Sequence, residues 1–279
     1  MPARFFVVPE WQGSSSSRSM RLIDGAEAIR GDLPSGATET VEVPLGAGEA
    51  LGTGVARFSS LAQVRDRLAE ALRRAPADRV PIVVGGDCGV ELAAVEHALA
   101  AREDVAVVWF DAHPDLHLPG DSPSGAFHGM VARALLGEGA EGLTASPALT
   151  PGRLVLAGVR ACEPEEDAFI AEAGVPMLGP GALEDPAALV EAVAATGAGA
   201  VYVHVDLDVI DPEEIQGVAA PEPFGVPVPA LTAAIRAVRE RFPLVGAGIT
   251  EFAPASPVDA RTDLPAVLRV LSALTARVG

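Results

Sequence analysis

Residues 107–130 (VVWFDAHPDLHLPGDSPSGAFHGM) concentrate carboxylate and imidazole side chains directly after an apolar run. Three of the five histidines of the chain fall within sixteen of these residues. Asp111, His113 and Asp115 are spaced two apart, so an extended backbone would point all three side chains to the same side. Oxygen and nitrogen atoms gathered in this way can bind a metal ion or transfer protons.

A second pair of aspartates, Asp206 and Asp208 in HVDLDVIDP, shows the same spacing. Either motif alone could consist of aspartates that cap helices or form turns. If the motifs meet, up to four negative charges lie together, which is costly unless cations neutralise them. A divalent metal pair is the natural neutraliser; this donor set suits manganese, with zinc, cobalt or iron as alternatives. Because a two-metal site can hold a bridging hydroxide for attack, the predicted chemistry is hydrolysis.

Valine-rich runs alternate with longer alanine- and leucine-rich stretches along the chain. We predict buried strands over 80–86, 105–110, 153–159, 200–209 and 244–250. We predict helices over 61–75, 90–103, 186–196, 228–242 and 264–278. This alternation predicts an α/β fold with a parallel sheet and helices on both faces, and we expect residues 1–279 to form a single domain.

The functional crevice of an open parallel sheet lies at the carboxyl ends of its strands. Every predicted strand is followed there by polar residues able to bind metal or to act as acid and base. In chain order these are Asp87 and Cys88, Asp111 to Asp115, Arg160 to Glu163, Asp206 and Asp208, and Glu251.

The composition limits the partners of the chain. The formal net charge is -18 and lysine is absent, so phosphate backbones are repelled and no nucleic-acid partner is expected. An acidic cleft would instead concentrate metal ions and cationic substrates. No apolar run reaches the roughly 18 residues of a membrane span, and the amino terminus lacks the pattern of a secretory signal. We therefore expect a cytoplasmic protein without a membrane segment.

The motifs GGDCG (85–89), DAHPD (111–115), HVDLDVIDP (204–212) and EFAP (251–254) resemble, in order and spacing, those of the ureohydrolases. This family includes arginase, agmatinase, guanidinobutyrase and formimidoylglutamase. The resemblance implies a three-layer α/β/α fold with a mostly parallel sheet of about eight strands. It also implies a manganese pair, a small guanidino or amidine substrate, and a homo-oligomer, either a trimer or a hexamer.

The resemblance also assigns roles to individual residues. The implied metal ligands are Asp111, His113, Asp115, Asp206, Asp208 and, with a reservation, Cys88. His128 matches the histidine proposed to shuttle protons, Asp115 would hold the attacking hydroxide, and Glu251 matches the carboxylate that grips the guanidinium or amidine group.

Position 88 departs from the family pattern, which usually has a histidine bound to the first metal there. A Cys88 thiolate is softer and would shift the preference towards zinc or iron. A buried inert cysteine is the alternative, and the first site, left with carboxylates only, would then bind its metal weakly or not at all. We expect His204 to support the ligands by hydrogen bonding rather than to bind metal.

The substrate loop departs as well. Ser124 matches a family serine, but His117 stands where arginases carry an asparagine, and Glu163 replaces the usual aspartate of the loop that contacts the substrate amine. These three residues are the remaining candidates for substrate binding. His117 could instead be a replacement ligand for the first metal or a solvated loop residue.

Three functions follow from these observations. The first is hydrolysis of a linear C–N bond in an amidine or guanidino compound by a metal-bridging hydroxide. The second is a single-metal amidohydrolase, motivated by Cys88. The third is a catalytically silent relative that acts as a binding or regulatory protein, against which the retention of His128 and Glu251 argues.

Overall fold

The computed structural model describes residues 1–277, in which eight strands form one sheet. The strands are β1 (Ala3–Val8), β2 (Thr38–Thr40), β3 (Val80–Gly85), β4 (Val105–Phe110), β5 (Leu154–Ala157), β6 (Met177–Leu178), β7 (Ala200–Asp206) and β8 (Leu244–Thr250). Their order is β2-β1-β3-β8-β7-β4-β5-β6, and every pair is parallel. The predicted fold class is thereby confirmed.

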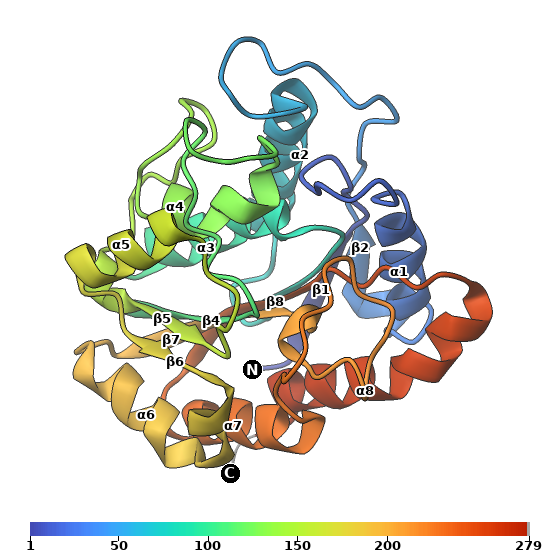
Figure 1. Ribbon diagram of the computed structural model, residues 1–279. Helices are drawn as coiled ribbons and strands as arrows, with labels where there is room; N and C mark the ends of the chain where they lie inside the picture. Colours follow the sequence, from blue (N-terminus) through green and yellow to red (C-terminus); the bar gives the residue numbers. More distant parts are fainter. Residues whose placement is uncertain (278–279) are drawn as a thin grey trace.

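Helices cover both faces of the sheet and complete three layers (Figure 1). Helices α1 (Arg21–Arg30), α6 (Pro186–Ala195), α7 (Val228–Arg241) and α8 (Pro257–Thr275) contribute to the hydrophobic core on one face. Helices α2 (Phe58–Arg73), α3 (Glu91–Ala101), α4 (Val131–Leu135) and α5 (Pro164–Ala173) contribute to the core on the other. None of the helices in the described residues combines the length and apolar character that a bilayer crossing requires. We infer one domain, because a single sheet links the two cores.

All five predicted strands and five predicted helices are present, with ends shifted by a few residues. The last helix begins at Pro257 rather than 264, because the Ser256 hydroxyl caps it by accepting from the Asp259 N–H. Residue 278, which the prediction placed in this helix, lies outside the described residues. The sequence reasoning missed β1, β2 and β6 of the sheet and helices α1, α4 and α5.

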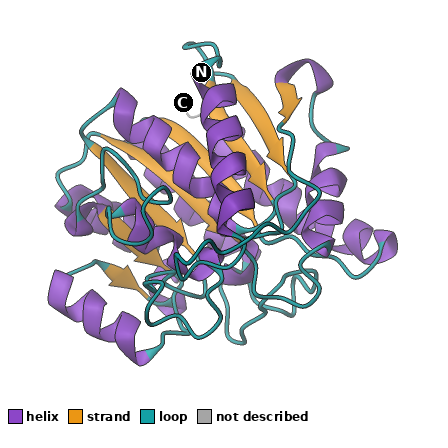
Figure 2. Cartoon of the chain, turned by 90° about the horizontal axis from the view of Figure 1, so that it is seen from above, coloured by secondary structure: helices purple, strands orange, loops and turns teal. Residues whose placement is uncertain are grey.

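Strand β7 shows how the sheet positions the functional side chains. All seven of its residues are buried, and successive side chains point to opposite faces. Val203 and Val205 pack into the core of α6 and α7, whereas Tyr202 packs into the core of α3. His204 and Asp206, which alternate with Val203 and Val205, therefore lie on the α3 side. Figure 2 shows long loops gathered at one end of the strands.

Candidate active site

The predicted polar residues come together where four adjacent strands end. Strands β3, β8, β7 and β4 are neighbours at the centre of the sheet. Cys88 lies just beyond β3, Glu251 follows β8, Asp206 ends β7 and Asp111 follows β4. Because the strands are parallel, their carboxyl ends meet at one edge, and all four side chains are at most 4% exposed.

Asp111, His113 and Asp208 form the first group of donor atoms, all within 4.8 Å of one another. The His113 Nδ1 atom lies 3.0 Å from Asp208 Oδ2 and 3.5 Å from Asp111 Oδ1. Burial lowers the pKa of His113, but the two aspartates outweigh it and raise this pKa to about 12. The two aspartates thus stabilise a positive charge beside them. A divalent cation bound there can supply this charge in place of the proton on His113.

Backbone amides fix the orientation of these carboxylates. Asp208 Oδ1 accepts from the Ala112 N–H at 3.0 Å, and Asp206 Oδ1 accepts from the Asp208 N–H at 2.7 Å. The indole of Trp109 donates to Asp111 Oδ2 at 3.1 Å. The carboxylates are therefore held in place before any cation binds.

Cys88 lies against Asp206 and Thr250 at the centre of the site. Its thiol donates to Asp206 Oδ2 at 3.3 Å, and its Sγ atom is 3.2 Å from Thr250 Oγ1. Cys88, Asp206 and Glu251 form a second group with donor atoms within 4.8 Å of one another. Burial raises the pKa of the thiol well above its usual range, and the charge of Asp206 raises it further. Without a bound cation, Cys88 is a protonated thiol that hydrogen-bonds a carboxylate.

Two carboxylates of the site have buried oxygens without a hydrogen-bond partner among the described residues, namely Oδ2 of Asp115 and both oxygens of Glu251. Both residues adopt positive φ angles, 54° and 64°, which are uncommon outside glycine. Burial, then like charges, raises the pKa of Asp115; burial also raises that of Glu251. Strained backbone and unsatisfied oxygens converge here, as expected where cations or cationic groups bind. The donor set therefore fits divalent metal ions.

His128 lies at the mouth of the site between a carboxylate and a loop near the amino terminus. Its Nδ1 atom is 3.3 Å from Glu251 Oε1, and its Nε2 atom accepts from the Ser15 N–H at 3.2 Å. Burial lowers the pKa of His128, but Glu251 and Asp87 outweigh this effect and the net shift is upwards. The imidazole can therefore hold a proton next to Glu251 and release it, as an acid catalyst must.

A cavity of about 270 Å³ opens over these residues. His113, Asp115, His128 and Glu251 line its inner part. The candidates for substrate binding line the same cavity, and they are His117, Ser124 and Glu163. A larger cavity of about 700 Å³ lies between residues 213–221 and the start of α8, but none of the predicted site residues lines it. The smaller cavity is lined by the predicted site residues, and we take it as the candidate substrate site.

The substrate candidates are held in different ways. His117 is nearly buried; its Nδ1 is 3.4 Å from Asp121 Oδ1 and its Nε2 is 3.6 Å from Glu163 Oε2. Glu163 forms a capping box with Glu166 at the start of α5, yet its side chain is half exposed. The Ser124 hydroxyl accepts from a backbone N–H of its own loop. His117 is thus a fixed wall residue of the cavity, and it does not belong to any of the donor groups described above.

The sequence reasoning missed Ser15 and Glu166, which also line the cavity. Ser15 lies 113 positions before His128, in a serine-rich loop without any catalytic motif. Glu163 and Glu166 are three residues apart at the start of α5, and this spacing was the signal that could have revealed the capping box. No local pattern pointed to Ser15.

Comparisons with known proteins identify relatives of this chain. Residues 17–275 match the profile of the arginase family. An arginase of Bacillus caldovelox is 29% identical over 224 residues, which are 75% of this chain and 73% of that protein. The N(omega)-hydroxy-L-arginine amidinohydrolase of Streptomyces lavendulae is 30% identical over 217 residues, or 76% and 74% of the two chains. The Entamoeba histolytica arginase structure in complex with L-ornithine has a TM-score of 0.87 at 22% identity and covers 99% of this chain and 98% of its own.

Proposed function

The chain belongs to the arginase family, and on that premise we propose that it is a metal-dependent hydrolase of a small guanidino or amidine compound. The bond cleaved is a linear C–N bond. The observation that carries the proposal is the geometry of the cavity. It brings a cluster of buried carboxylates together with His113 and places the His128–Glu251 pair beside them.

The residues that would hold the metal ions are the clustered carboxylates and His113. We propose two divalent ions, manganese in the first instance, with zinc, iron or cobalt as alternatives. The proposed ligands are Asp111, His113, Asp115, Asp206, Asp208 and Cys88. When bound, such ions lower the pKa of a coordinated water and so supply a nucleophile at neutral pH.

Glu251 is suited to bind the planar cation of the substrate. It is 2% exposed, it lines the cavity, and within residues 1–277 neither of its oxygens accepts a hydrogen bond of good geometry, although His128 Nδ1 lies 3.3 Å from its Oε1. A guanidinium or amidinium group offers paired N–H donors that match the two oxygens of one carboxylate. Binding would also neutralise a buried negative charge, so the site favours a cationic group over a neutral one.

Asp115 and His128 would move the protons of the reaction. The free Oδ2 of Asp115 can accept a proton or a hydrogen bond from the attacking water. The Ser15 N–H that donates to His128 Nε2 keeps the lone pair of the neutral ring on Nε2 and its proton on Nδ1. With its raised pKa, the protonated ring can donate a proton to the leaving amine.

The size of the cavity favours a short substrate. At about 270 Å³ the space is below the 300–1,000 Å³ range common for drug-sized ligands. Glu163 and Glu166, which line the cavity, suit a second positive charge, whereas an N–H of the His117 ring suits an anionic end. We propose a small guanidino or formimino compound with a polar group at the far end, held by His117, Ser124 and Glu163.

The test is a panel of guanidino and formimino compounds, scored for release of urea or formamide by the manganese-loaded protein. Glu251→Gln should lower kcat/KM at least about 100-fold, because it removes the charge that binds the cation, and should leave metal content unchanged. Glu138→Gln, an exposed carboxylate paired with Arg133, is the matched control. Full activity of the Glu251 variant, or no turnover of any panel compound, would contradict the proposal.

One observation favours a second candidate, a single-metal amidohydrolase. The Cys88 thiol already donates to Asp206, so the first site has a hydrogen bond that does not require a metal. A single ion would then bind at Asp111, His113 and Asp208. Elemental analysis after removal of excess metal separates the candidates, since two ions per chain support the first and one supports the second.

We further propose that the enzyme is cytoplasmic and works as a homo-oligomer, a trimer or a hexamer, as the resemblance to the ureohydrolases implies. Light scattering coupled to gel filtration measures the assembly directly. A monomer at micromolar concentration would contradict this part of the proposal.

A further inference from the structure

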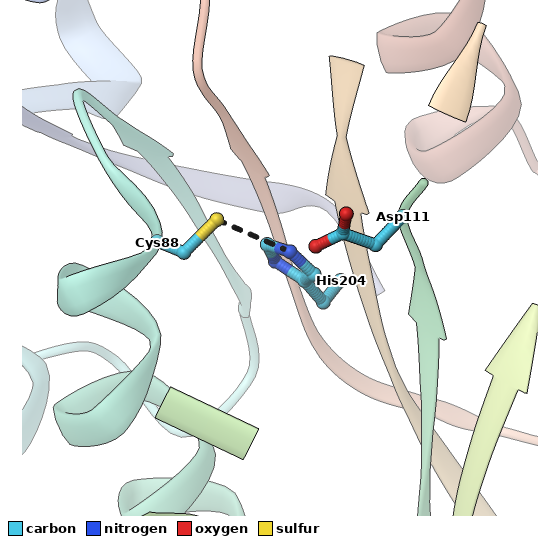
Figure 3. Close-up of side chains that lie close together, drawn as sticks. All are labelled: Cys88, Asp111 and His204. Atoms are coloured by element: carbon cyan, nitrogen blue, oxygen red, sulfur yellow. Dashed lines mark hydrogen bonds between the residues drawn. The ribbon is translucent and has the colours of Figure 1, made fainter. Parts of the chain in front are cut away.

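His204 lies behind the site on β7 with its ring held rigidly. The residue is fully buried, and its ring stacks on Trp109 with the centroids 3.6 Å apart. Its Nε2 atom lies 3.7 Å from Cys88 Sγ (Figure 3). Cys88, His204 and Asp111 form a third group whose donor atoms lie within 4.8 Å of one another. The imidazole is thus placed among potential ligands.

The other nitrogen of this ring faces a buried carboxylate. His204 Nδ1 lies 3.6 Å from Glu91 Oε2, and Glu91 itself accepts from the Tyr202 hydroxyl at 2.7 Å. Histidines that bind metals commonly direct their second nitrogen to a carboxylate, which orients the ring and fixes its tautomer. A proton on Nδ1 would leave the lone pair of Nε2 directed towards Cys88 and Asp111.

The distances match those around a small tetrahedral ion. With about 2.3 Å to sulfur and about 2.0 Å to nitrogen, a tetrahedral angle separates the two ligand atoms by about 3.5 Å. The observed separation between Cys88 Sγ and His204 Nε2 is 3.7 Å. Asp111 completes the set, since its carboxylate oxygen lies within 4.8 Å of the Cys88 sulfur and of a ring nitrogen of His204.

We propose that Cys88, His204 and Asp111 bind one divalent ion as a sulfur–nitrogen–oxygen site that prefers zinc to manganese. This inference rests on the proposed function, because the ion would be the first of the metal pair. The imidazole that the ureohydrolase pattern places at position 88 would be supplied here from position 204, on strand β7. Thiolate with imidazole is a donor set typical of zinc, whereas manganese favours oxygen ligands.

Direct ligation differs from simple support in one measurable respect. A supporting His204 would only hydrogen-bond the Cys88 thiol, and its nitrogen would have no bond to the metal. A ligating His204 has such a bond, which NMR detects as a scalar coupling between an isotope-labelled imidazole nitrogen and an NMR-active cadmium isotope used in place of zinc. The chain has only five histidines, so their signals can be assigned by substitution.

The experiment is performed on the full chain with labelled histidine and bound cadmium. We expect a split His204 nitrogen signal in the wild type, and we expect Cys88→Ser to move the cadmium resonance because a sulfur ligand is lost. His204→Gln should remove this split signal and leave any splitting of the His113 signal, which would arise from the neighbouring ion. His97→Gln, which replaces a half-buried histidine of α3 outside the site, should remove one signal and leave the coupling unchanged. An unsplit His204 signal in the cadmium-bound wild type, or no bound cadmium, would overturn the inference without any need for the variants.

Metal preference is measured separately, by elemental analysis after dialysis against equal concentrations of zinc and manganese. The wild type should retain one zinc per chain, and Cys88→Ser or His204→Gln should lose most of it; retention of manganese alone by the wild type would overturn the preference. Neither readout uses turnover. A split His204 signal in a protein that hydrolyses no panel compound would support the metal site and contradict the proposed function. Turnover of a panel compound by a protein with an unsplit His204 signal would support the proposed function and contradict the metal site.

Discussion

Replacing Asp206 by asparagine should stabilise the metal-free protein. The donor atoms of Asp206 and Glu251 lie within 4.8 Å of each other, and both residues are almost fully buried. Two unit charges at that distance repel by about 3.5 kcal/mol at an effective dielectric constant of 20. Asparagine removes one charge and keeps an oxygen that can accept from the Asp208 N–H. Partial protonation already relieves some of this repulsion, so the expected gain in the free energy of unfolding is about 1–3 kcal/mol.

The pH dependence of this gain has a definite sign. Burial, followed by the charges of Asp208 and Asp111, raises the pKa of Asp206 in the folded state. The unfolded chain therefore releases this proton at lower pH than the folded protein does. The metal-free wild type loses stability as pH rises from the usual aspartate pKa through the raised one, and the advantage of the variant grows over the same interval.

Metal reverses the order of stability. An ion that binds only the folded protein, at 1,000 times its dissociation constant, stabilises the wild type by about 4.1 kcal/mol, which exceeds the gain of the variant in chelator. The variant lacks one of the proposed ligands and should lose most of that gain. Asp206→Asn is thus expected to be the more stable protein in chelator and the less stable one in manganese.

Urea unfolding at pH 6 and pH 8, in chelator and in manganese, measures the free energy of unfolding of the wild type and the variant under each of these conditions. Asp66→Asn changes the same charge at an exposed position of α2 and serves as the matched control. A variant less stable than the wild type in chelator at pH 8 would show that the carboxylates do not repel one another. Equal stabilisation of both proteins by manganese would show that Asp206 is not a ligand.

Three further predictions concern the surroundings of the site. Tyr202→Phe removes the buried hydroxyl that donates to Glu91 at 2.7 Å and should cost about 1–3 kcal/mol of unfolding free energy in urea. Replacing glycine by alanine normally stabilises a helix such as α1. Gly25→Ala should instead destabilise the protein by about 1–3 kcal/mol or abolish folding, because the added methyl group would overlap the Phe252 carbonyl oxygen. Thermal melting of the variant measures the loss of stability. Turnover should fall as pH rises through the raised pKa of His128, and His128→Asn should remove that alkaline limb from the pH–rate profile; an unchanged limb would exclude His128 as the proton donor.

The central strands could be predicted because they are buried on both faces. Strands β3, β4 and β7 appear in the sequence as nearly continuous valine-rich runs, which half-buried strands do not show. The edge strands β2 and β6 have three and two residues, too few for any periodicity. Helix α1 carries Gly25, which weakens a helical pattern, and the structure explains this glycine by close packing against the chain at Phe252.

The site could be predicted in part, because alternate spacing at strand ends is a local signal. Asp111, His113 and Asp208 do lie together, as predicted. The extended backbone assumed for residues 111–115 is wrong, because β4 ends at Phe110 and Asp115 adopts a left-handed φ, and Asp115 does not join that group. Contacts made by loops from distant parts of the chain left no such signal. The contact of Ser15 with His128 depends on the path of an amino-terminal loop, which local patterns do not specify.

Strand β8 lies between β3 and β7, although it is the last strand to be synthesised. Until it is inserted, the sheet consists of two separate halves, with Cys88 on one half and Asp111 and Asp206 on the other. A nascent chain that ends before β8 therefore has two unpaired strand edges, and it lacks both Glu251 and the β8 strand that joins the half carrying Cys88 to the half carrying Asp206. The group of Asp111, His113 and Asp208 lies on one half and can form without β8, whereas the group of Cys88, Asp206 and Glu251 needs both halves and β8 itself. Prematurely terminated chains would therefore lack the second group and would expose edges prone to aggregation.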